Sequence, residues 1–235
     1  MQQAIHKEPM LGVIGGLGPE TSAAFCLNVI RRIQSLQQRQ PRILLENVPL
    51  SFRDEQVLIE GGEKTNHRRL ILQAANRLSL VGCTSLVIPC NTAHLFIEEL
   101  RNSTSVPFIS ILEESVRRCH EGGRRRIGVL ASTKTLQENL HAPLFSSFGI
   151  SLLFPRNQHE IDALISRILK EGPRESDKKR MQEMCVALKR QGAERILLAC
   201  TELSLVGRGL PDTLDSLEIL EEAAVRHLSG GEDDG

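Results

Sequence analysis

The chain has 235 residues, with 29 Lys and Arg against 29 Asp and Glu, seven His, six Cys, and neither Trp nor Tyr. This length allows one large domain or two small ones, and a hydrophobic content of 40% is typical of a globular protein. A net charge of zero argues against a general nucleic-acid binder, which carries a basic excess. No apolar run approaches the ~20 residues of a membrane helix. We therefore expect neither nucleic acid nor membrane as a partner.

The cysteines are scattered along the chain and show no CxxC pair. This spacing predicts free thiols rather than a disulfide framework, and it predicts no metal site. The N-terminal residues contain no apolar stretch of signal-peptide length, which favours a cytoplasmic, reducing location. Free thiols in such a compartment are mostly small buried hydrophobes.

Short apolar runs alternate with amphipathic segments along the chain. The first run, 10–14, ends in a glycine turn, after which Pro19 and Glu20 suit the first turn of a helix. The other predicted strands are 43–48, 85–89, 126–131, 151–154 and 195–199. The predicted helices are 19–38, a segment around 70–78, 93–101, 158–171, 173–191 and 217–228. This alternation is typical of a parallel α/β sheet.

A weak internal repeat divides the chain. MLGVIGGLG at 10–18 resembles RIGVLASTK at 126–134, and SLVIPCNTA at 85–93 resembles RILLACTEL at 195–203. We predict an α/β fold of two similar lobes related by a pseudo-twofold axis, each a mostly parallel sheet flanked by helices. The site is expected in the cleft between them, at the carboxyl ends of the strands. The predicted boundaries are 1–112 with a returning 212–228, then 113–211, and a disordered tail at 229–235.

Cys90 and Cys200 each end an apolar strand, and each comes directly before a helix. Because a helix N-terminus stabilises a thiolate, we expect a lowered pKa at either cysteine. Facing thiols suit one reaction above others, in which one takes a proton from a stereocentre and the other returns one to the opposite face. Either cysteine alone is better explained by burial, and the matched pair favours function. The remaining cysteines are predicted to be structural: Cys26, Cys83, Cys119 and Cys185.

The glycine turn has a competing interpretation as a nucleotide site. Gly16-Leu17-Gly18 after a strand begins a dinucleotide fingerprint, and Glu46 stands where a ribose would be held. Thr21 occupies the third glycine position, which weakens this hypothesis. Simpler structural roles also stay open: helix capping for Asn91 and Thr92, a helix-dipole contact for Glu202, packing for His94, and solvated charges for Arg53 and Lys170.

Three segments, GVIGGLGPETSA, PCNTAH and ACTEL, resemble the signature segments of the aspartate racemase branch of the Asp/Glu racemase family. The resemblance spans about residues 10–225. It implies a homodimer of two-lobed subunits that racemises aspartate, or glutamate, without pyridoxal phosphate or another cofactor. It also implies that Cys90 and Cys200 are the acid and base, with Cys90 serving the D enantiomer and Cys200 the L enantiomer.

The same resemblance implies roles for residues around the cysteines. Residues beside them would hold the α-carboxylate, a hydroxyl pair would support it, and two cations would clamp an acidic side chain, with Arg53 and Lys170 as those cations. The full set of predicted substrate-binding residues is Leu17, Arg53, Asn91, Thr92, Ser132, Thr135, Lys170, Thr201 and Glu202.

Two other functions stay open. One keeps the fold and changes the chemistry, as in a maleate isomerase, a hydantoin racemase or an arylmalonate decarboxylase relative. The other is a degenerate pair of lobes that binds an acidic ligand as a regulator without turnover. The two cysteines and the two cations favour an amino-acid racemase, because the decarboxylase relatives work with one cysteine.

Overall fold

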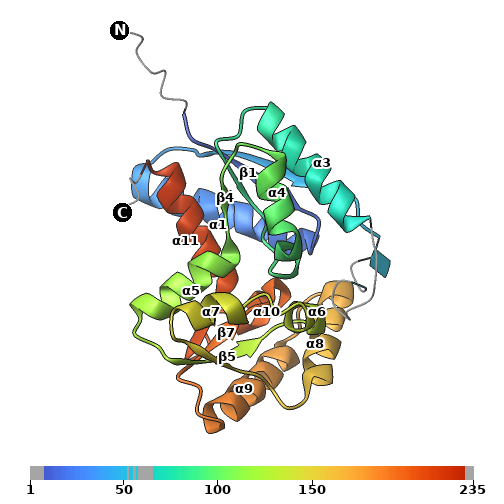
Figure 1. Cartoon of the computed structure of the whole chain (residues 1–235), viewed down its shortest axis with the longest axis vertical. Helices are drawn as coiled ribbons and strands as arrows, with labels where there is room; N and C mark the ends of the chain where they lie inside the picture. The colour runs from blue at the N-terminus through green and yellow to red at the C-terminus, as the bar shows by residue number, and fades with distance from the viewer. Residues whose placement is uncertain (1–7, 52, 55–56, 58–65, 231–235) are drawn as a thin grey trace.

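The computed structural model describes residues 8–51, 53–54, 57 and 66–230, which form two lobes arranged along the long axis of the molecule (Figure 1). Each lobe holds a parallel four-stranded sheet, and the strand orders are β2-β1-β3-β4 and β6-β5-β7-β8. The two orders are equivalent, so the predicted repeat and the predicted two-lobed fold are confirmed. The strands are β1 (Met10–Gly15), β2 (Arg42–Asn47), β3 (Ser85–Val87), β4 (Phe108–Ile109), β5 (Arg126–Leu130), β6 (Ser151–Leu153), β7 (Arg195–Leu198) and β8 (Thr213–Asp215).

Helices cover both faces of each sheet. The helices associated with the first sheet are α1 (Pro19–Gln37), α3 (His67–Leu80), the 3-10 turn η1 (Thr92–Phe96), α4 (Ile97–Ser103) and α5 (Ile111–Glu121). The later helices are α6 (Thr133–Gln137), α7 (Ala142–Ser147), α8 (Gln158–Glu171), α9 (Glu175–Arg190), α10 (Thr201–Gly207) and α11 (Ser216–Leu228). Among the described residues, no helix is both long and apolar enough to span a bilayer.

The central strand β1 is buried along its whole length, and its side chains alternate between two cores. Leu11 and Val13 pack with Phe25 of α1, while Ile14 on the opposite face packs with Ile71 of α3. The second sheet repeats this arrangement. A strand that is buried on both faces has a continuous apolar sequence, and this is why β1 could be predicted from residues 10–14.

Two helices connect the lobes. Ile111 and Leu112 at the start of α5 lie in a core of the first lobe, whereas Val116 and Cys119 further along lie in a core of the second. The last helix, α11, follows β8 of the second sheet and packs against α1 and α5 (Figure 1). The predicted boundaries, with 212–228 returning to the first lobe, stay a proposal that this packing supports.

The sequence analysis did not predict the strands β4 and β8 or the helices α5, α6, α7 and α10. It placed the end of α8 correctly, because Gly172 there adopts a positive φ of 75° that glycine favours. The predicted tail lies mostly outside the described residues, from position 231 onward.

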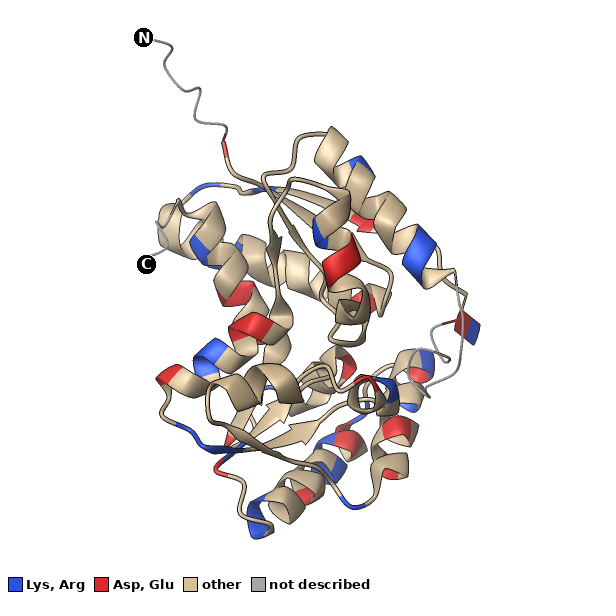
Figure 2. Ribbon diagram, in the orientation of Figure 1, with Lys and Arg blue, Asp and Glu red and all other residues tan. Residues whose placement is uncertain are grey.

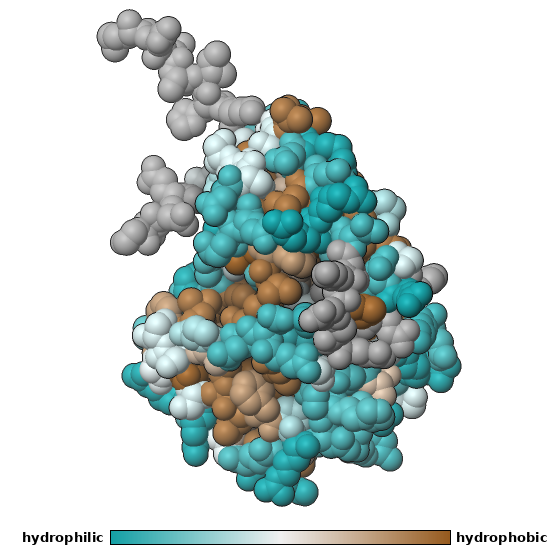
Figure 3. All heavy atoms as spheres, turned by 45° about the vertical axis from the view of Figure 1, so that its right-hand side comes forward, coloured by the Kyte–Doolittle hydropathy of each residue, from teal (hydrophilic) through white to brown (hydrophobic). Residues whose placement is uncertain are grey.

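Charged residues lie on the outer helices, and both signs occur together on α8 and α9 (Figure 2). Apolar residues show at the waist between the lobes and on the face of the second lobe (Figure 3).

Candidate active site

A pocket lies where the carboxyl ends of the strands of both sheets meet. Each sheet contributes the loops that follow its two central strands, β1 and β3 from one lobe and β5 and β7 from the other. Helix α8 closes one side with Leu169. The lining residues are Leu17, Gly18, Cys90, Asn91, Thr92, Ser132, Leu169, Cys200, Thr201 and Glu202.

The two pocket cysteines differ in environment. Cys90 is half-buried, whereas Cys200 is buried and its Sγ donates a hydrogen bond to Glu202 Oε2 at 3.0 Å. Burial raises the pKa of the Cys200 thiol well above its ordinary value, and the negative charge and hydrogen bond of Glu202 raise it further, with a smaller contribution from Cys90. The expectation of a lowered pKa is therefore wrong for Cys200. Desolvation and a neighbouring carboxylate outweigh the N-terminus of the short helix α10.

Glu202 reaches across the cleft to the glycine turn. Its carboxylate is buried, which raises its pKa, while hydrogen bonds from Cys200 Sγ, its own backbone and Thr201 Oγ1 oppose that rise. Gly18 has a φ of 85°, and any Cβ there would overlap Glu202 Oε1. A positive φ and the close approach of a carboxylate from the other lobe both require glycine at this position.

The glycine turn therefore serves a contact between lobes, and Glu46 lies elsewhere. Glu46 Oε1 accepts a hydrogen bond from Arg77 Nε at 2.9 Å on the outside of the sheet. Nothing in this arrangement supports the dinucleotide interpretation.

Three hydroxyl groups from the two lobes form a closed triangle. Thr92 Oγ1 lies 3.1 Å from Ser132 Oγ and 2.8 Å from Thr135 Oγ1, and the latter two oxygens are 3.0 Å apart. All three residues are buried. Three hydroxyls carry three protons, so they can satisfy one another or turn together to donate to a single anionic group.

Asn91 and Thr92 do not cap the following turn. Asn91 occupies the N-cap position of η1, but no side-chain capping hydrogen bond is present there. Instead Asn91 Nδ2 donates to Ser216 Oγ at 3.0 Å, and Asn91 Oδ1 is buried without a hydrogen-bond partner among the described residues.

His94 is hydrogen-bonded to the backbone of the Cys90 loop, a role that the sequence analysis did not predict. Its Nδ1 donates to the Cys90 carbonyl at 2.9 Å, and its Nε2 accepts from the backbone N–H of Ile111 at 3.3 Å. Burial lowers the pKa of His94 to about 4, so the ring is neutral and its tautomer is fixed by these two contacts. The spacing of four residues between Cys90 and His94 could have indicated this contact, because residues four apart lie on the same side of a helical turn.

The two predicted cations lie outside this arrangement. Arg53 and Lys170 are both exposed, and neither is among the described residues that line the pocket. Leu169, the neighbour of Lys170, lines it instead. The remaining predicted residues are brought together, with Thr135 joining through the hydroxyl triangle.

The described residues contain no cluster of three or more His, Cys, Asp or Glu side chains that would hold a metal ion. None of the six cysteines, all of which the structure describes, forms a disulfide. Burial raises the pKa of Cys26 and of Cys185 to about 11 and that of Cys119 to about 12, so these thiols stay protonated and unreactive near neutral pH.

The fold is thus a pair of equivalent α/β lobes, and each lobe places one cysteine in the shared pocket after the third strand of its sheet in chain order. A family model described as Asp/Glu/hydantoin racemase matches residues 14–226. The chain therefore belongs to the Asp/Glu/hydantoin racemase family.

Individual relatives agree with this assignment. The broad specificity amino-acid racemase RacX of Bacillus subtilis is 24% identical over 203 residues, which cover 84% of this chain and 87% of that protein. The aspartate racemase of Picrophilus torridus has a similar fold, with a TM-score of 0.76, 20% identity and coverage of 94% of each chain. Glutamate racemase of Francisella tularensis, solved with D-glutamate, gives a TM-score of 0.68 at 13% identity, covering 97% of this chain and 84% of that one. At these identities the solved structures establish the fold alone.

Proposed function

We propose that the protein is a cofactor-independent amino-acid racemase in which Cys90 and Cys200 are the paired acid and base. The observation that carries this proposal is the pair of equivalent cysteines in one pocket, one of them hydrogen-bonded to a buried carboxylate. A regulator that only binds an acidic ligand has no need of this pair, and a one-cysteine decarboxylase has no need of the second.

The proton balance of the reaction follows from the two thiols. The thiolate of one cysteine takes the α-hydrogen as a proton, and the electron pair left on the α-carbon delocalises into the α-carboxylate. The thiol of the other cysteine gives its proton to the opposite face of that carbon. The product is the other enantiomer, and the two cysteines have exchanged proton states, so their titration belongs to the pair.

Cys200 is the acid of the resting protein. Its burial and its contact with Glu202 keep the thiol protonated, which leaves the half-buried Cys90 as the base. The resemblance-based assignment of Cys90 to the D enantiomer then makes the resting protein ready for D substrate. After a turnover Cys200 carries the negative charge beside the Glu202 carboxylate, and the repulsion between the two charges favours return of a proton to Cys200.

The hydroxyl triangle is proposed to bind the α-carboxylate. As the α-proton leaves, negative charge grows on the carboxylate oxygens, and preorganised donors placed there stabilise the transition state more than the substrate. Thr92, Ser132 and Thr135 supply those donors by turning their protons from one another to the ligand. Asn91 and Thr201 also line the pocket, and they are proposed to contact the rest of the amino-acid backbone.

The substrate side chain separates two candidates. Aspartate or glutamate is the prediction that depends on Arg53 and Lys170, and it stays a prediction. A broader range that includes neutral amino acids is favoured by the lining, because no described lining residue is cationic while Leu17 and Leu169 offer apolar walls. Burying a second, unpaired carboxylate there would be costly. The similarity to a broad specificity racemase supports the broader range.

Proton NMR in deuterated water tests the function directly. The protein, without added cofactor, is incubated separately with the L and D forms of aspartate, glutamate and a set of neutral amino acids. We expect loss of the α-proton signal together with formation of the opposite enantiomer, from both directions, for at least one amino acid. Binding without exchange for every amino acid would favour the regulator, and release of carbon dioxide from a malonate would favour the decarboxylase. A homodimer and a cytoplasmic location remain sequence-based predictions.

A further inference from the structure

Ser216 lies between the two cysteine loops without lining the pocket. It is the first residue of α11 and is fully buried. Its Oγ donates to the carbonyl oxygen of Leu198 at 2.7 Å and accepts from Asn91 Nδ2 at 3.0 Å. Asn91 directly follows Cys90 in one lobe, and Leu198 ends the strand that leads to Cys200 in the other. The Ser216 hydroxyl thus joins the backbone that precedes Cys200 to the Asn91 side chain that follows Cys90.

The proton of this hydroxyl determines the orientation of Asn91. A carbonyl oxygen only accepts, so the single Ser216 proton goes to Leu198. The Ser216 oxygen must then accept from the amide NH₂ of Asn91, which turns Asn91 Oδ1 to the other side. That oxygen is the buried acceptor without a partner among the described residues. Ser216 therefore fixes the orientation of the Asn91 amide, with its NH₂ group toward Ser216 and its acceptor oxygen away from it.

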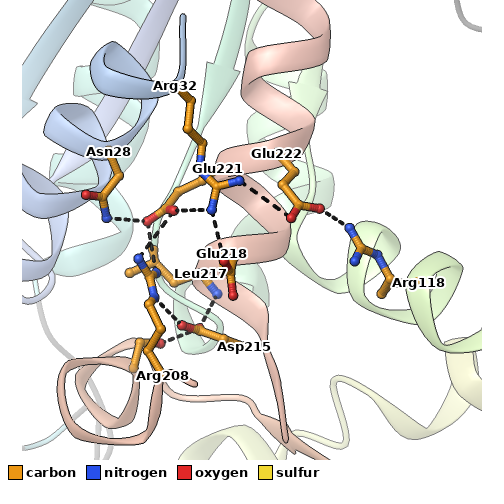
Figure 4. Close-up of polar contacts among 10 residues, drawn as sticks. Asn28, Arg32, Arg118, Arg208, Asp215, Leu217, Glu218, Glu221 and Glu222 are labelled. Atoms are coloured by element: carbon orange, nitrogen blue, oxygen red, sulfur yellow. Dashed lines mark hydrogen bonds and ion pairs between the residues drawn. The ribbon is translucent and has the colours of Figure 1, made fainter. Parts of the chain in front are cut away.

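Ser216 is itself held rigidly by the residues around it. Asp215 caps α11 by accepting from the Leu217 N–H at 2.9 Å, and the same carboxylate accepts from Ser204 Oγ at 2.5 Å and from Arg208 Nε at 2.8 Å. Arg208 in turn donates to the fully buried Glu221 at 2.9 Å (Figure 4). The start of α11 is thereby fixed to α10, the helix that begins after Cys200.

This ionic cluster also reaches the first lobe. Asn28 of α1 donates to Glu221 at 2.8 Å, and Arg32 of α1 donates to Glu218 at 2.9 Å (Figure 4). The position of Ser216 is consequently defined by both lobes at once, and a hydroxyl held in this way can set the relative position of the two cysteine loops.

We propose that Ser216 is a positioning residue for racemisation, acting through Asn91 on the Cys90 side and through the Leu198 carbonyl on the Cys200 side. The proposal depends on the two-cysteine function proposed above. Neither contact touches the reacting atoms, so the effect is on geometry. Misplacing reacting groups by about an ångström lowers rates by as much as a hundredfold.

The test compares Ser216→Ala with Ser115→Ala as a matched control. Ser115 is equally buried, and its Oγ donates to the Ile111 carbonyl at 2.6 Å within α5. Activity is the rate of α-proton exchange and inversion for the amino acid that the wild-type protein turns over fastest. We expect Ser216→Ala to lower kcat/KM by about tenfold to a hundredfold in both directions and Ser115→Ala to leave it within about twofold.

A double-mutant cycle separates positioning from simple stabilisation. Because Ser216 acts partly through Asn91, the double variant Ser216→Ala, Asn91→Ala should fall less than the product of the two single losses. Fully multiplicative losses, or equal activity of the two serine variants, would overturn the proposal. Ser216→Thr retains the hydroxyl and should recover most of the activity lost in Ser216→Ala, which covers the case in which the alanine variant folds poorly. A wild-type protein inactive on every amino acid would instead defeat the proposed function.

Discussion

We predict that the fold loses stability in acid because of two buried histidines, His94, which contacts the Cys90 carbonyl, and His141, which precedes α7. Burial lowers the pKa of each from 6.5 to about 4. At His94 the hydrogen bond to the Cys90 carbonyl opposes this shift and the positive charge of Arg101 adds to it, while at His141 the neighbouring His94 adds to it. Both nitrogens of His141 are buried without hydrogen-bond partners among the described residues. The unfolded chain therefore binds protons on these rings before the folded protein does. This contribution to stability is fully present above about pH 6.5 and is lost as the pH falls toward 4.

The size of the loss can be worked out from these values. A shift from 6.5 to about 4 corresponds at pH 5 to about 2 kcal/mol for each histidine. Two such losses are a large part of the roughly 5–15 kcal/mol by which a domain is stable. Urea unfolding at pH 7 and pH 5 measures the difference. Far-UV circular dichroism is the suitable probe, because the chain has neither Trp nor Tyr for intrinsic fluorescence.

A variant isolates the histidine contribution from that of the carboxylates, which also titrate in acid. His141→Leu removes the proton site with a side chain of similar volume and leaves no broken hydrogen bond among the described residues. We expect its loss of unfolding free energy between pH 7 and pH 5 to be about 2 kcal/mol smaller than that of the wild type. The control is His159→Leu, which changes an exposed residue of α8. Equal pH dependence for His141→Leu and the wild type would refute this reasoning.

Three further predictions concern the pocket. Thr92→Val removes a hydroxyl from the triangle and is expected to lower kcat/KM by about tenfold to a hundredfold, which is what a hydrogen bond to a charged group contributes. The control Thr213→Val, which lies far from the pocket, should change kcat/KM little. Equal effects of the two variants would argue against carboxylate binding by the triangle. Gly18→Ala should lower both Tm and activity, because the alanine would adopt a strained positive φ and its Cβ would displace Glu202. Gly123 also has a positive φ, 66°, but open space around it, so Gly123→Ala should lower Tm alone. A fully active Gly18→Ala would contradict the contact between the lobes. Arg53→Ala and Lys170→Ala should leave kcat/KM for neutral amino acids within about twofold of the wild-type value. A selective loss of more than about tenfold for aspartate would instead show that these two cations bind an acidic side chain.

Much of this fold was predictable because its central strands are buried on both faces. β1, β5 and β7 are continuous apolar runs, and the small residues that follow them mark the ligand-binding edge. The short strands β4 and β8 have too few residues to show a period, and α5 is divided between two cores, so its apolar positions serve two lobes at once. Such elements depend on tertiary contacts that a local pattern does not contain.

The site residues that could be predicted follow the central strands, either directly after a cysteine or in the turns after β1 and β5. Asn91, Thr92, Thr201 and Glu202 follow this rule. The partner of Asn91, Ser216, lies 125 residues away in sequence, and no local signal connects the two. The direction of the Cys200 pKa shift could not be predicted from the sequence either, because it depends on burial and on the orientation of the Glu202 carboxylate.

The central claim is that two thiols act on opposite faces of one carbon, and α-proton exchange in the single variants Cys90→Ala and Cys200→Ala tests it most directly. Each variant is incubated in deuterated water with each enantiomer of the best wild-type substrate, and the α-proton signal and the enantiomer ratio are followed together. Both variants should lose racemisation while circular dichroism shows an intact fold, and any exchange that persists should retain configuration and be confined to one enantiomer, a different one for each variant. Racemisation at the wild-type rate in either variant would contradict the claim.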